Sequence, residues 1–296
     1  MRLSPDARDV HPVMKRFLAA CGLMFGVSSA YAEPTLVVTP TSVHPGDAVV
    51  VSVIGTAALP HGKAGGVPLH FFAAKRGFQA VFATPLEINE DHILVEVTDG
   101  PAPLSVAVVA KRLPESSVVV EDELANPPKA DRERIDLDNG AIGAAYAKAD
   151  GAPQFVHPFR RPPGGVTSTF GEWRTFNDGH RSQHLGLDLG EPEGAKVLAI
   201  NSGTVALVRT TVLAGNVVVV AHGGGITSMY FHLARSLVAE GDVVTQGTPL
   251  GLVGHTGRTT GPHLHLGVHV AGGMVDPATF LELPLAPATP PATARR

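Results

Sequence analysis

Two short stretches of the chain carry histidines and a carboxylate at spacings that suit metal chemistry. The first spans residues 261–270 and contains His263 and His265 on either side of a leucine. Apolar residues alternate along it as in a β-strand, so both imidazoles project from one face while leucines and valines face a core. Imidazole is the commonest metal ligand and a common general base. The stretch therefore predicts a strand that offers two nitrogen ligands or bases.

The second stretch, residues 184–189, alternates in the same way and places His184 and Asp188 on its polar face. In a flat strand their Cα atoms would lie about 13 Å apart. The chain must therefore bend if both are to reach one ion, and Gly186 tolerates a bend or bulge. Together the two stretches supply two histidines and one carboxylate, a donor set that leaves a catalytic zinc ion one open position.

The composition favours a β-rich protein with many turns. Among the 296 residues are 33 glycines and 25 prolines, while 44% are hydrophobic and only 5% are aromatic. The length and the hydrophobic content are enough for one large or two small domains. The formal net charge of −4 predicts no nucleic-acid partner, because such binding requires a basic surface. The single cysteine lies near the amino terminus, so a processed chain has neither a disulfide framework nor a cysteine nucleophile.

Residues 1–32 read as a short upstream segment followed by a cleaved secretory signal that starts at Met14. A basic start, an apolar run and the small residues of Ala30-Tyr31-Ala32 are the three parts of such a signal. An apolar run of about 11 residues is too short to span a bilayer. We therefore expect cleavage before Glu33 and export to the periplasm or beyond. An acylation box that ends at Cys21 is the alternative to this cleavage.

Residues 33–112 show short β patterns separated by turn signals such as His44-Pro45-Gly46-Asp47. About six strands in so short a segment indicate a small antiparallel sandwich of immunoglobulin-like type. The strands are expected at 35–38, 48–54, 69–74, 79–83, 92–98 and 104–111.

Residues 113–155 are acidic and are interrupted by Asn126-Pro127-Pro128. We expect a linker whose carboxylates form a solvated face, with one helix over 131–149 that is weakened by Gly140 and Gly143.

The β pattern returns in residues 156–283, where a hairpin is expected at Gly223-Gly224-Gly225. The fold class is therefore mainly β, with two β domains. Residues 284–296 are rich in proline, alanine and threonine, and we expect them to be a disordered tail. The strands of the second domain are expected at 196–200, 204–209, 216–221, 226–232, 250–253 and 263–270.

Spaced motifs across residues 158–277 resemble the lysostaphin-type zinc endopeptidases, also called the LytM family. The resemblance implies that residues 156–283 form an antiparallel LytM-type peptidase domain, a hybrid with lipoyl/biotinyl-like barrels. The order of the two domains also resembles that of family members with an amino-terminal immunoglobulin-like domain. The motifs are Thr167-Ser168-Thr169-Phe170-Gly171, His184 to Asp188, Gly215-Asn216, His222-Gly223, Tyr230 to Leu233, Gly241-Asp242, Gly254-His255-Thr256-Gly257 and Gly261 to His265.

The resemblance also implies the roles of five residues, none of which is substituted in this chain. His184, Asp188 and His265 correspond to the ligands of one zinc ion. His232 and His263 correspond to the two catalytic histidines. The chain has no His-Glu-x-x-His helix and therefore no glutamate base of that type, so one histidine is expected to act on the zinc-bound water and the other to stabilise the oxyanion or protonate the leaving amine. Which histidine does which stays open.

Two features around these residues set further expectations. Leu266-Gly267 follows His265 at two positions where the family often has an aromatic residue and an acid. This difference is expected to alter the substrate groove and not the metal ligands. The remaining histidines of this region are expected to lie away from the metal. They are His180, His222, His255 and His269.

The leading hypothesis from the sequence is an exported zinc metalloendopeptidase that hydrolyses peptide cross-links of peptidoglycan, with a cell-envelope protein as a candidate partner of the amino-terminal domain. One alternative is a non-enzymatic relative that activates cell-wall amidases, although such relatives have usually lost ligands. A second is a carrier module, because residues 241–247 resemble a lipoyl/biotinyl-type turn. Such carriers display a lysine at a hairpin tip, and no tip motif surrounds Lys196, the nearest candidate.

Overall fold

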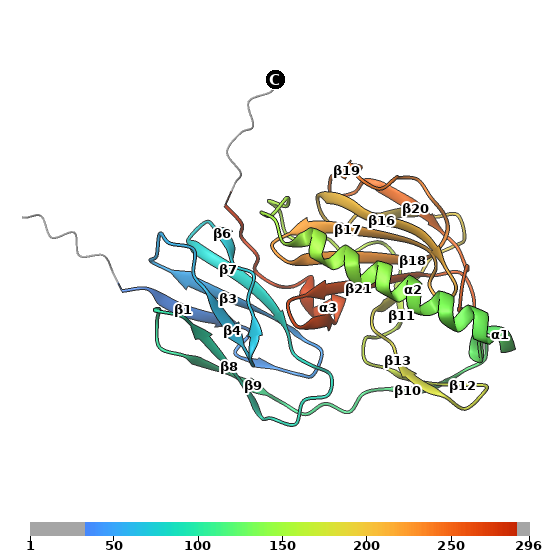
Figure 1. Cartoon of the computed structure of the whole chain (residues 1–296), viewed down its shortest axis with the longest axis horizontal. Coiled ribbons are helices and arrows are strands. Elements are labelled where there is room, and N and C mark those ends of the chain that lie inside the picture. Colours follow the sequence, from blue (N-terminus) through green and yellow to red (C-terminus); the bar gives the residue numbers. More distant parts are fainter. Residues whose placement is uncertain (1–32, 289–296) are drawn as a thin grey trace, which may run out of the picture. The chain divides into compact units, whose positions relative to one another are not determined.

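The computed structural model describes residues 33–288 (Figure 1). The predicted signal segment, residues 1–32, lies outside the described residues, as do residues 289–296. Strands dominate the described part and pair mostly antiparallel, which confirms the mainly β fold class. None of the helices within 33–288 is both long and apolar enough to cross a bilayer.

The amino-terminal part is a sandwich of two sheets. The first has the order β1-β3-β7-β6, with strands Thr35–Thr39 (β1), Ala48–Ile54 (β3), Gly77–Ala83 (β7) and Phe72–Ala74 (β6). The second has the order β2-β9-β8-β4-β5, with strands Ser42–Val43 (β2), Leu104–Val108 (β9), His92–Val97 (β8), Gly62–Ala64 (β4) and Val67–Pro68 (β5). Two stacked sheets are what the alternating pattern predicts, and the immunoglobulin-like assignment stays a prediction.

Strand β3 explains how this sandwich joins the rest of the molecule. Val49, Val51 and Val53 point into the core between the two sheets. Ala48 and Val50 belong instead to the core of the carboxy-terminal part, because successive side chains of a strand face opposite sides. Burial on both faces is the reason that β3 reads as a continuous apolar run rather than as a strict alternation.

The segment predicted as an acidic linker contributes both a strand and a helix to the carboxy-terminal part. Glu115–Val118 (β10) pairs parallel to Trp173–Phe176 (β12), which in turn pairs with Arg181–Gln183 (β13). After a short helix, Asp122–Ala125 (α1), the helix expected over 131–149 runs as Lys129–Tyr146 (α2) and ends in a 3-10 turn at Ala147–Ala149.

The prediction that the carboxylates of this segment form a solvated face is wrong for Asp138. Its side chain is buried, with 3% of the residue exposed, on the same helix face as Ile142 and Ala145. The carboxylate accepts hydrogen bonds from Arg209 Nε at 2.7 Å and from the backbone N–H of Val212 at 3.1 Å. These two hydrogen bonds replace the hydration of the carboxylate, and they hold α2 against the neighbouring sheet.

Asp138→Asn is expected to lower the free energy of unfolding by about 1.5–3 kcal/mol at neutral pH, because a charge-assisted bond to a buried group is lost. Burial alone would raise the pKa of Asp138, but Arg209 and the Val212 amide outweigh it and hold this pKa below its ordinary value. The stabilisation is therefore complete above the unfolded pKa of about 3.9 and is lost as the pH falls through the folded pKa.

Urea denaturation at pH 7 and at pH 3 measures this difference. Asp136→Asn, on the exposed side of the same helix, is the matched control and is expected to change little. Equal stability of Asp138→Asn and the wild type at pH 7 would contradict the anchoring role.

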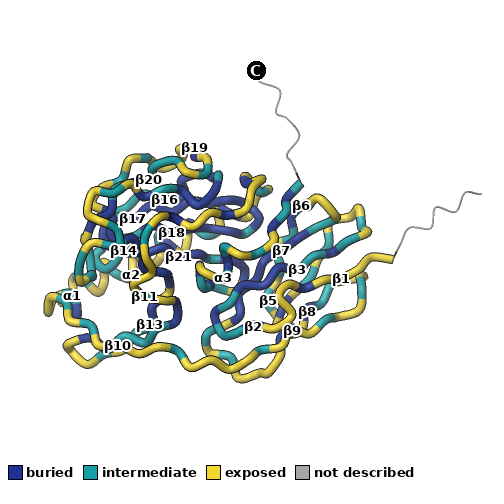
Figure 2. Tube along the Cα trace, turned by 180° about the vertical axis from the view of Figure 1, so that it is seen from behind, coloured by how far each residue is buried: buried dark blue, intermediate teal, exposed yellow. Residues whose placement is uncertain are grey.

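The carboxy-terminal part is built on one large sheet whose main path is β11-β14-β21-β18-β17-β16-β19. Its apolar face and the strands that curl over it form the largest core cluster, and the tube of Figure 2 shows β17, β18 and β21 as largely buried. The strands are Gly165–Ser168 (β11), Leu187–Gly190 (β14), Leu264–Val270 (β21), Ile226–Ser236 (β18), Gly215–Gly223 (β17), Gly203–Thr211 (β16) and Val243–Val244 (β19), with Lys196–Leu198 (β15), Pro249–Val253 (β20) and Gly273–Val275 (β22) attached off this path.

The expected disordered tail is wrong for residues 284–288. Leu285 is buried in the large core cluster, and the backbone N–H of Ala286 donates to Gln79 Oε1 at 2.9 Å. The backbone of Ala288 donates to Ala73 at 2.9 Å, so this segment lies along the edge of β6. A short helix, Pro277–Phe280 (α3), precedes it. The proline-rich composition disfavours regular structure but does not prevent a segment from pairing with an open strand edge.

Candidate metal centre

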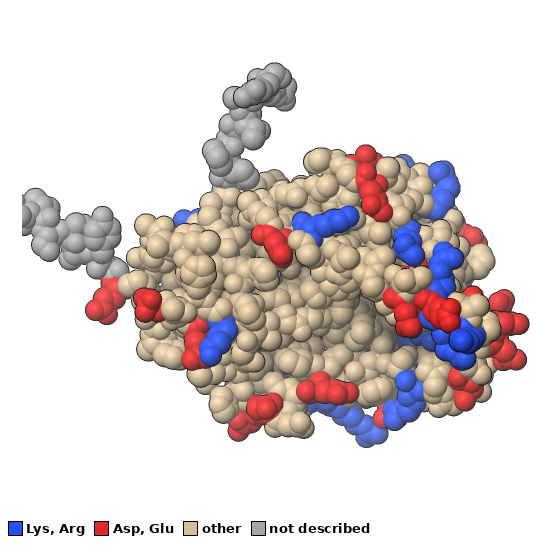
Figure 3. All heavy atoms as spheres, in the orientation of Figure 1, with Lys and Arg blue, Asp and Glu red and all other residues tan. Residues whose placement is uncertain are grey.

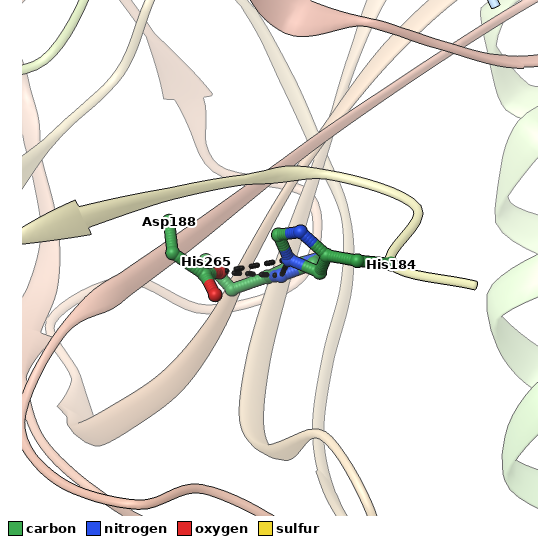
Figure 4. A group of neighbouring side chains, drawn as sticks. All are labelled: His184, Asp188 and His265. Carbon is green, nitrogen blue, oxygen red and sulfur yellow. Dashed lines mark hydrogen bonds and ion pairs between the residues drawn. The ribbon is translucent and has the colours of Figure 1, made fainter. Parts of the chain in front are cut away.

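Three side chains that are distant in sequence converge at one point, as Figure 4 shows. His184 Nε2 lies 2.9 Å from Asp188 Oδ1 and 2.8 Å from His265 Nδ1. His265 Nδ1 lies 2.9 Å from the same carboxylate oxygen. All three residues are buried. The structure therefore brings together the three residues that the sequence proposes as metal ligands.

The sheet pairing and one glycine account for this convergence. Asp188 of β14 is the direct cross-strand partner of His265 of β21. His184 precedes β14, and the chain bends at Gly186, as the distance argument requires. A Cβ at Gly186 would collide with the ring of His265 and the backbone of Leu266. Only glycine therefore lets the loop come this close to the ligand strand.

The donor set fits a divalent cation. The Nδ1–H of His184 donates to the carbonyl of Thr169 at 2.8 Å, which leaves the lone pair of its Nε2 directed at Asp188 and His265. Two imidazole nitrogens and a carboxylate oxygen thus face one another at hydrogen-bond distance. Two neutral nitrogens so close repel each other unless a proton or a cation lies between them. Nitrogen and carboxylate ligands of this number match zinc.

A set of polar contacts orients the carboxylate. Arg174 donates to Asp188 Oδ2 at 2.7 Å, which leaves Oδ1 for the two histidines. The Nε of Arg174 also pairs with Glu172 at 3.1 Å, and its Nη2 lies 2.6 Å from Ser168 Oγ. Burial opposes the charge of Asp188, but the close contacts of its carboxylate with His184 and His265 outweigh burial and hold the pKa of Asp188 well below its usual range. The carboxylate is therefore ionised and ready to bind a cation.

His232 and His263 lie beside this cluster, with their ring centroids 5.0 Å apart. The Nδ1 of His232 is 2.8 Å from the carbonyl of Thr256, and that of His263 is 2.8 Å from the carbonyl of Gly261. A carbonyl only accepts, so each Nδ1 carries a proton, and in the neutral form of either ring the lone pair lies on Nε2. His263 Nε2 is 3.6 Å from Asp188 Oδ1.

His232 also has a backbone conformation that is uncommon for its residue type, with φ of 62° in the left-handed region. Burial, followed by the nearby His265 and His263, lowers the pKa of His232 to about 3, so the imidazole is neutral. A strained backbone at a buried imidazole is typical of a functional position. It also means that a substitution at this residue should tolerate positive φ.

The other histidines of the domain are engaged elsewhere, as expected. His180 stacks on Phe176 and pairs with Asp178, and His255 pairs with Glu193 at the surface. His269 stacks on Tyr146 of α2, with centroids 3.8 Å apart. His222 is fully buried and contacts Ser228 Oγ at 2.8 Å, so this Ser–His pair has a structural and not a nucleophilic role.

The five residues line a cleft of about 760 Å³, and a large part of its wall comes from the acidic segment. The sequence analysis missed this wall and Arg174, whose contacts are made between distant segments without a local pattern. Phe231 belongs to the motif Tyr230 to Leu233, and its ring stacks on that of His265 with centroids 5.1 Å apart. The lining residues from the acidic segment include Ser116 to Val120 of the β10 region and Ile135, Asp138, Asn139, Ile142 and Tyr146 of α2.

The antiparallel sheet thus brings together two histidines and an aspartate that could hold a metal ion, beside two further histidines. Comparison with known proteins agrees, because residues 182–277 match Peptidase family M23. The chain therefore contains a domain of Peptidase family M23, which includes all five residues.

Two relatives are from Vibrio cholerae serotype O1. The chain is 40% identical over 107 residues to peptidoglycan DD-endopeptidase ShyA, which is 36% of this chain and 25% of that protein. It is 42% identical over 103 residues to peptidoglycan DD-endopeptidase ShyB, which is 35% of this chain and 24% of that protein. The chain thus spans about a quarter of the length of these relatives.

A solved structure extends the likeness beyond this domain. The crystal structure of a peptidase M23 from Pseudomonas aeruginosa is 28% identical, with a TM-score of 0.60. The alignment covers 80% of this chain and 94% of that chain. The arrangement of the described strands is therefore shared with a protein of the same peptidase family.

Proposed function

We propose that this chain is an exported zinc endopeptidase that hydrolyses peptide cross-links of peptidoglycan. The observation that carries the proposal is the meeting of His184, Asp188 and His265 beside two further histidines in one cleft. The domain belongs to a peptidase family, and two relatives are named peptidoglycan DD-endopeptidases. Retention of the full ligand set argues against the non-enzymatic amidase activator.

His184, Asp188 and His265 would hold the zinc ion, and Arg174 would keep the aspartate oriented toward it. A bound zinc ion would lower the pKa of its water to about 7 and would polarise the peptide carbonyl. In their neutral forms, His232 and His263 both carry the lone pair on Nε2, so each can accept a proton at the start of the reaction. The imidazole that takes the proton can then return it to the leaving amine.

Digestion of purified peptidoglycan by residues 33–296, followed by mass spectrometry of the released fragments, tests this function. The proposal expects cross-linked fragments to separate at a peptide bond while the sugar chains stay intact. Fragments cut between sugar and peptide would show an amidase instead. An unchanged digest that becomes active only with an added amidase would favour the activator alternative.

Export is a further part of the proposal, and it rests on the signal pattern of residues 1–32. We expect the exported chain to begin at Glu33, because the small-x-small stretch Ala30-Tyr31-Ala32 directly precedes it. Amino-terminal sequencing of the protein recovered from the cell envelope measures this directly. A chain that begins with a lipid-modified Cys21 would show that the acylation box is used.

On the face drawn in Figure 3, Lys and Arg side chains lie among Asp and Glu side chains. The proposed partners are the peptidoglycan peptide and, through the amino-terminal sandwich, a protein of the cell envelope.

A further inference from the structure

Arg258 is a cationic side chain of the cleft that the chemistry above does not use. It lines the same cleft as the metal-ligand cluster and is only partly exposed. Its guanidinium carbon lies 4.3 Å from the centroid of the Phe176 ring, so the charge rests on an apolar surface. Such a stacked guanidinium still has its N–H groups directed around its edge, where they can bind a planar anion.

The second arginine of this wall shows by contrast what Arg258 lacks. Arg174 is neutralised by Asp188 at 2.7 Å and by Glu172 at 3.1 Å. Within residues 33–288, no carboxylate lies at ion-pair distance from Arg258, and its guanidinium makes no hydrogen bond. The acid that raises the pKa of Arg258 is Asp178, which itself accepts hydrogen bonds from the backbone and the ring of His180.

A half-buried charge without an anion is unfavourable, and the titration of Arg258 reflects this. Burial and then the neighbouring Arg174 lower the pKa of Arg258, and only Asp178 acts in the opposite direction. Removing a cation from water without pairing it has an energetic cost that an incoming anion would reverse. The wall therefore favours a ligand that places a negative charge next to Arg258.

The loop that carries Arg258 is held rigidly in place. The backbone N–H of Arg258 donates to Leu213 at 2.7 Å, and Thr256 Oγ1 donates to Leu233 at 2.8 Å. The carbonyl of Thr256 also accepts the proton of His232 Nδ1 at 2.8 Å. The same loop thus positions a candidate catalytic imidazole and Arg258, so an anion bound by the arginine would have a fixed place relative to the reaction centre.

From this geometry we propose that Arg258 binds a free carboxylate of the peptide substrate and so selects acidic peptides over their amidated forms. The proposal rests on the proposed peptidase function and names a feature of its substrate. A guanidinium–carboxylate pair is commonly bidentate and charge-assisted, which gives both orientation and affinity. The amide of the same peptide offers one neutral acceptor and two donors, and its donors would face the arginine's own N–H groups.

The test uses a synthetic cross-linked peptide with all its carboxylates free and a set in which each carboxyl group is amidated in turn. Steady-state kinetics of the zinc-loaded chain give kcat and KM for every member. We expect amidation of one particular carboxyl to raise KM about 10–100-fold in the wild type, the usual effect of losing a charge-assisted bond in a site. In Arg258→Gln this difference between free and amidated peptide should disappear, while Arg258→Lys should retain part of it.

Arg181→Gln is the matched control. Arg181 also stacks on an aromatic ring, that of Trp173, at 5.0 Å, but it pairs with Glu115 and does not line the cleft. This variant should keep the wild-type preference. Thermal unfolding and zinc content of all variants separate recognition from a merely structural role, because Arg258→Gln should keep both.

Two outcomes would overturn the proposal. The wild type could cleave free and amidated peptides equally, or Arg258→Gln could lose the same factor in kcat on both, which would give the arginine a role in the transition state or in folding. A wild type that cleaves none of the peptides contradicts the proposed peptidase function instead. Calorimetric binding of the same free and amidated peptides then decides the role of Arg258, because selection of a carboxylate does not require turnover.

Discussion

His265→Ala is expected to remove both bound zinc and peptidase activity. His265 supplies one of three converging donor atoms, and its Nδ1 lies within 2.9 Å of the other two. Loss of a residue that only orients a ligand typically costs 10–100-fold in metal affinity, so loss of a ligand should cost more than about 100-fold. The water position in the cleft would be lost with the metal. Elemental analysis of the purified variant, alongside peptide cleavage, measures both effects.

His269→Ala is the control from the same strand. His269 lies four residues further along β21 and stacks on Tyr146 instead of facing the ligand cluster. This variant should keep one zinc per chain and most of the activity. The ligand assignment would be contradicted if His265→Ala retained wild-type zinc, or if His269→Ala lost it.

His263→Ala is expected to keep its zinc and to lose about 10²–10⁴-fold in turnover, the usual contribution of a positioned acid or base. His263 lies immediately before β21 and two residues from the ligand His265, yet its Nδ1 is bound to Gly261 and its Nε2 stays 3.6 Å from Asp188. The three ligands are intact without it. Metal analysis and single-turnover kinetics on the same sample separate the two properties.

His232→Asn should behave in the same way, and asparagine is the suitable replacement because it tolerates the positive φ of this position. A loss of zinc in either variant, with zinc retained in His265→Ala, would reverse the assigned roles. Full activity of both variants would show that neither imidazole handles a proton in the reaction.

The sequence predicts the long apolar strands well because their signal is local. Strands β3, β17, β18 and β21 alternate or run apolar over many residues, and the structure places strands at each of these ranges. Strand β10 carries no such signal, because it is short, polar and half exposed. It forms only because β12 offers a parallel edge, and a distant partner of this kind leaves no trace in a short window of sequence.

The site follows the same rule. The spacing of His184 and Asp188 and the pair His263 and His265 are visible as motifs, and the cross-strand register then joins them. Arg174 and Arg258 lie in segments without a pattern of their own, and their environment depends on which loops meet. The burial of Asp138 is equally difficult to predict from the sequence, because an acidic helix face normally faces water. Asp138 is buried because its carboxylate pairs with the distant Arg209.

The most direct test of the central claim is the rate of peptide cross-link cleavage as a function of bound zinc in one preparation of the chain. Zinc is removed with a chelator, the rate is measured, and zinc is then returned stepwise while both quantities are followed. The account predicts that cleavage falls to background without the metal and rises in proportion until one zinc per chain is bound. Cleavage that persists in zinc-free protein, or that stays absent at one zinc per chain, would contradict it.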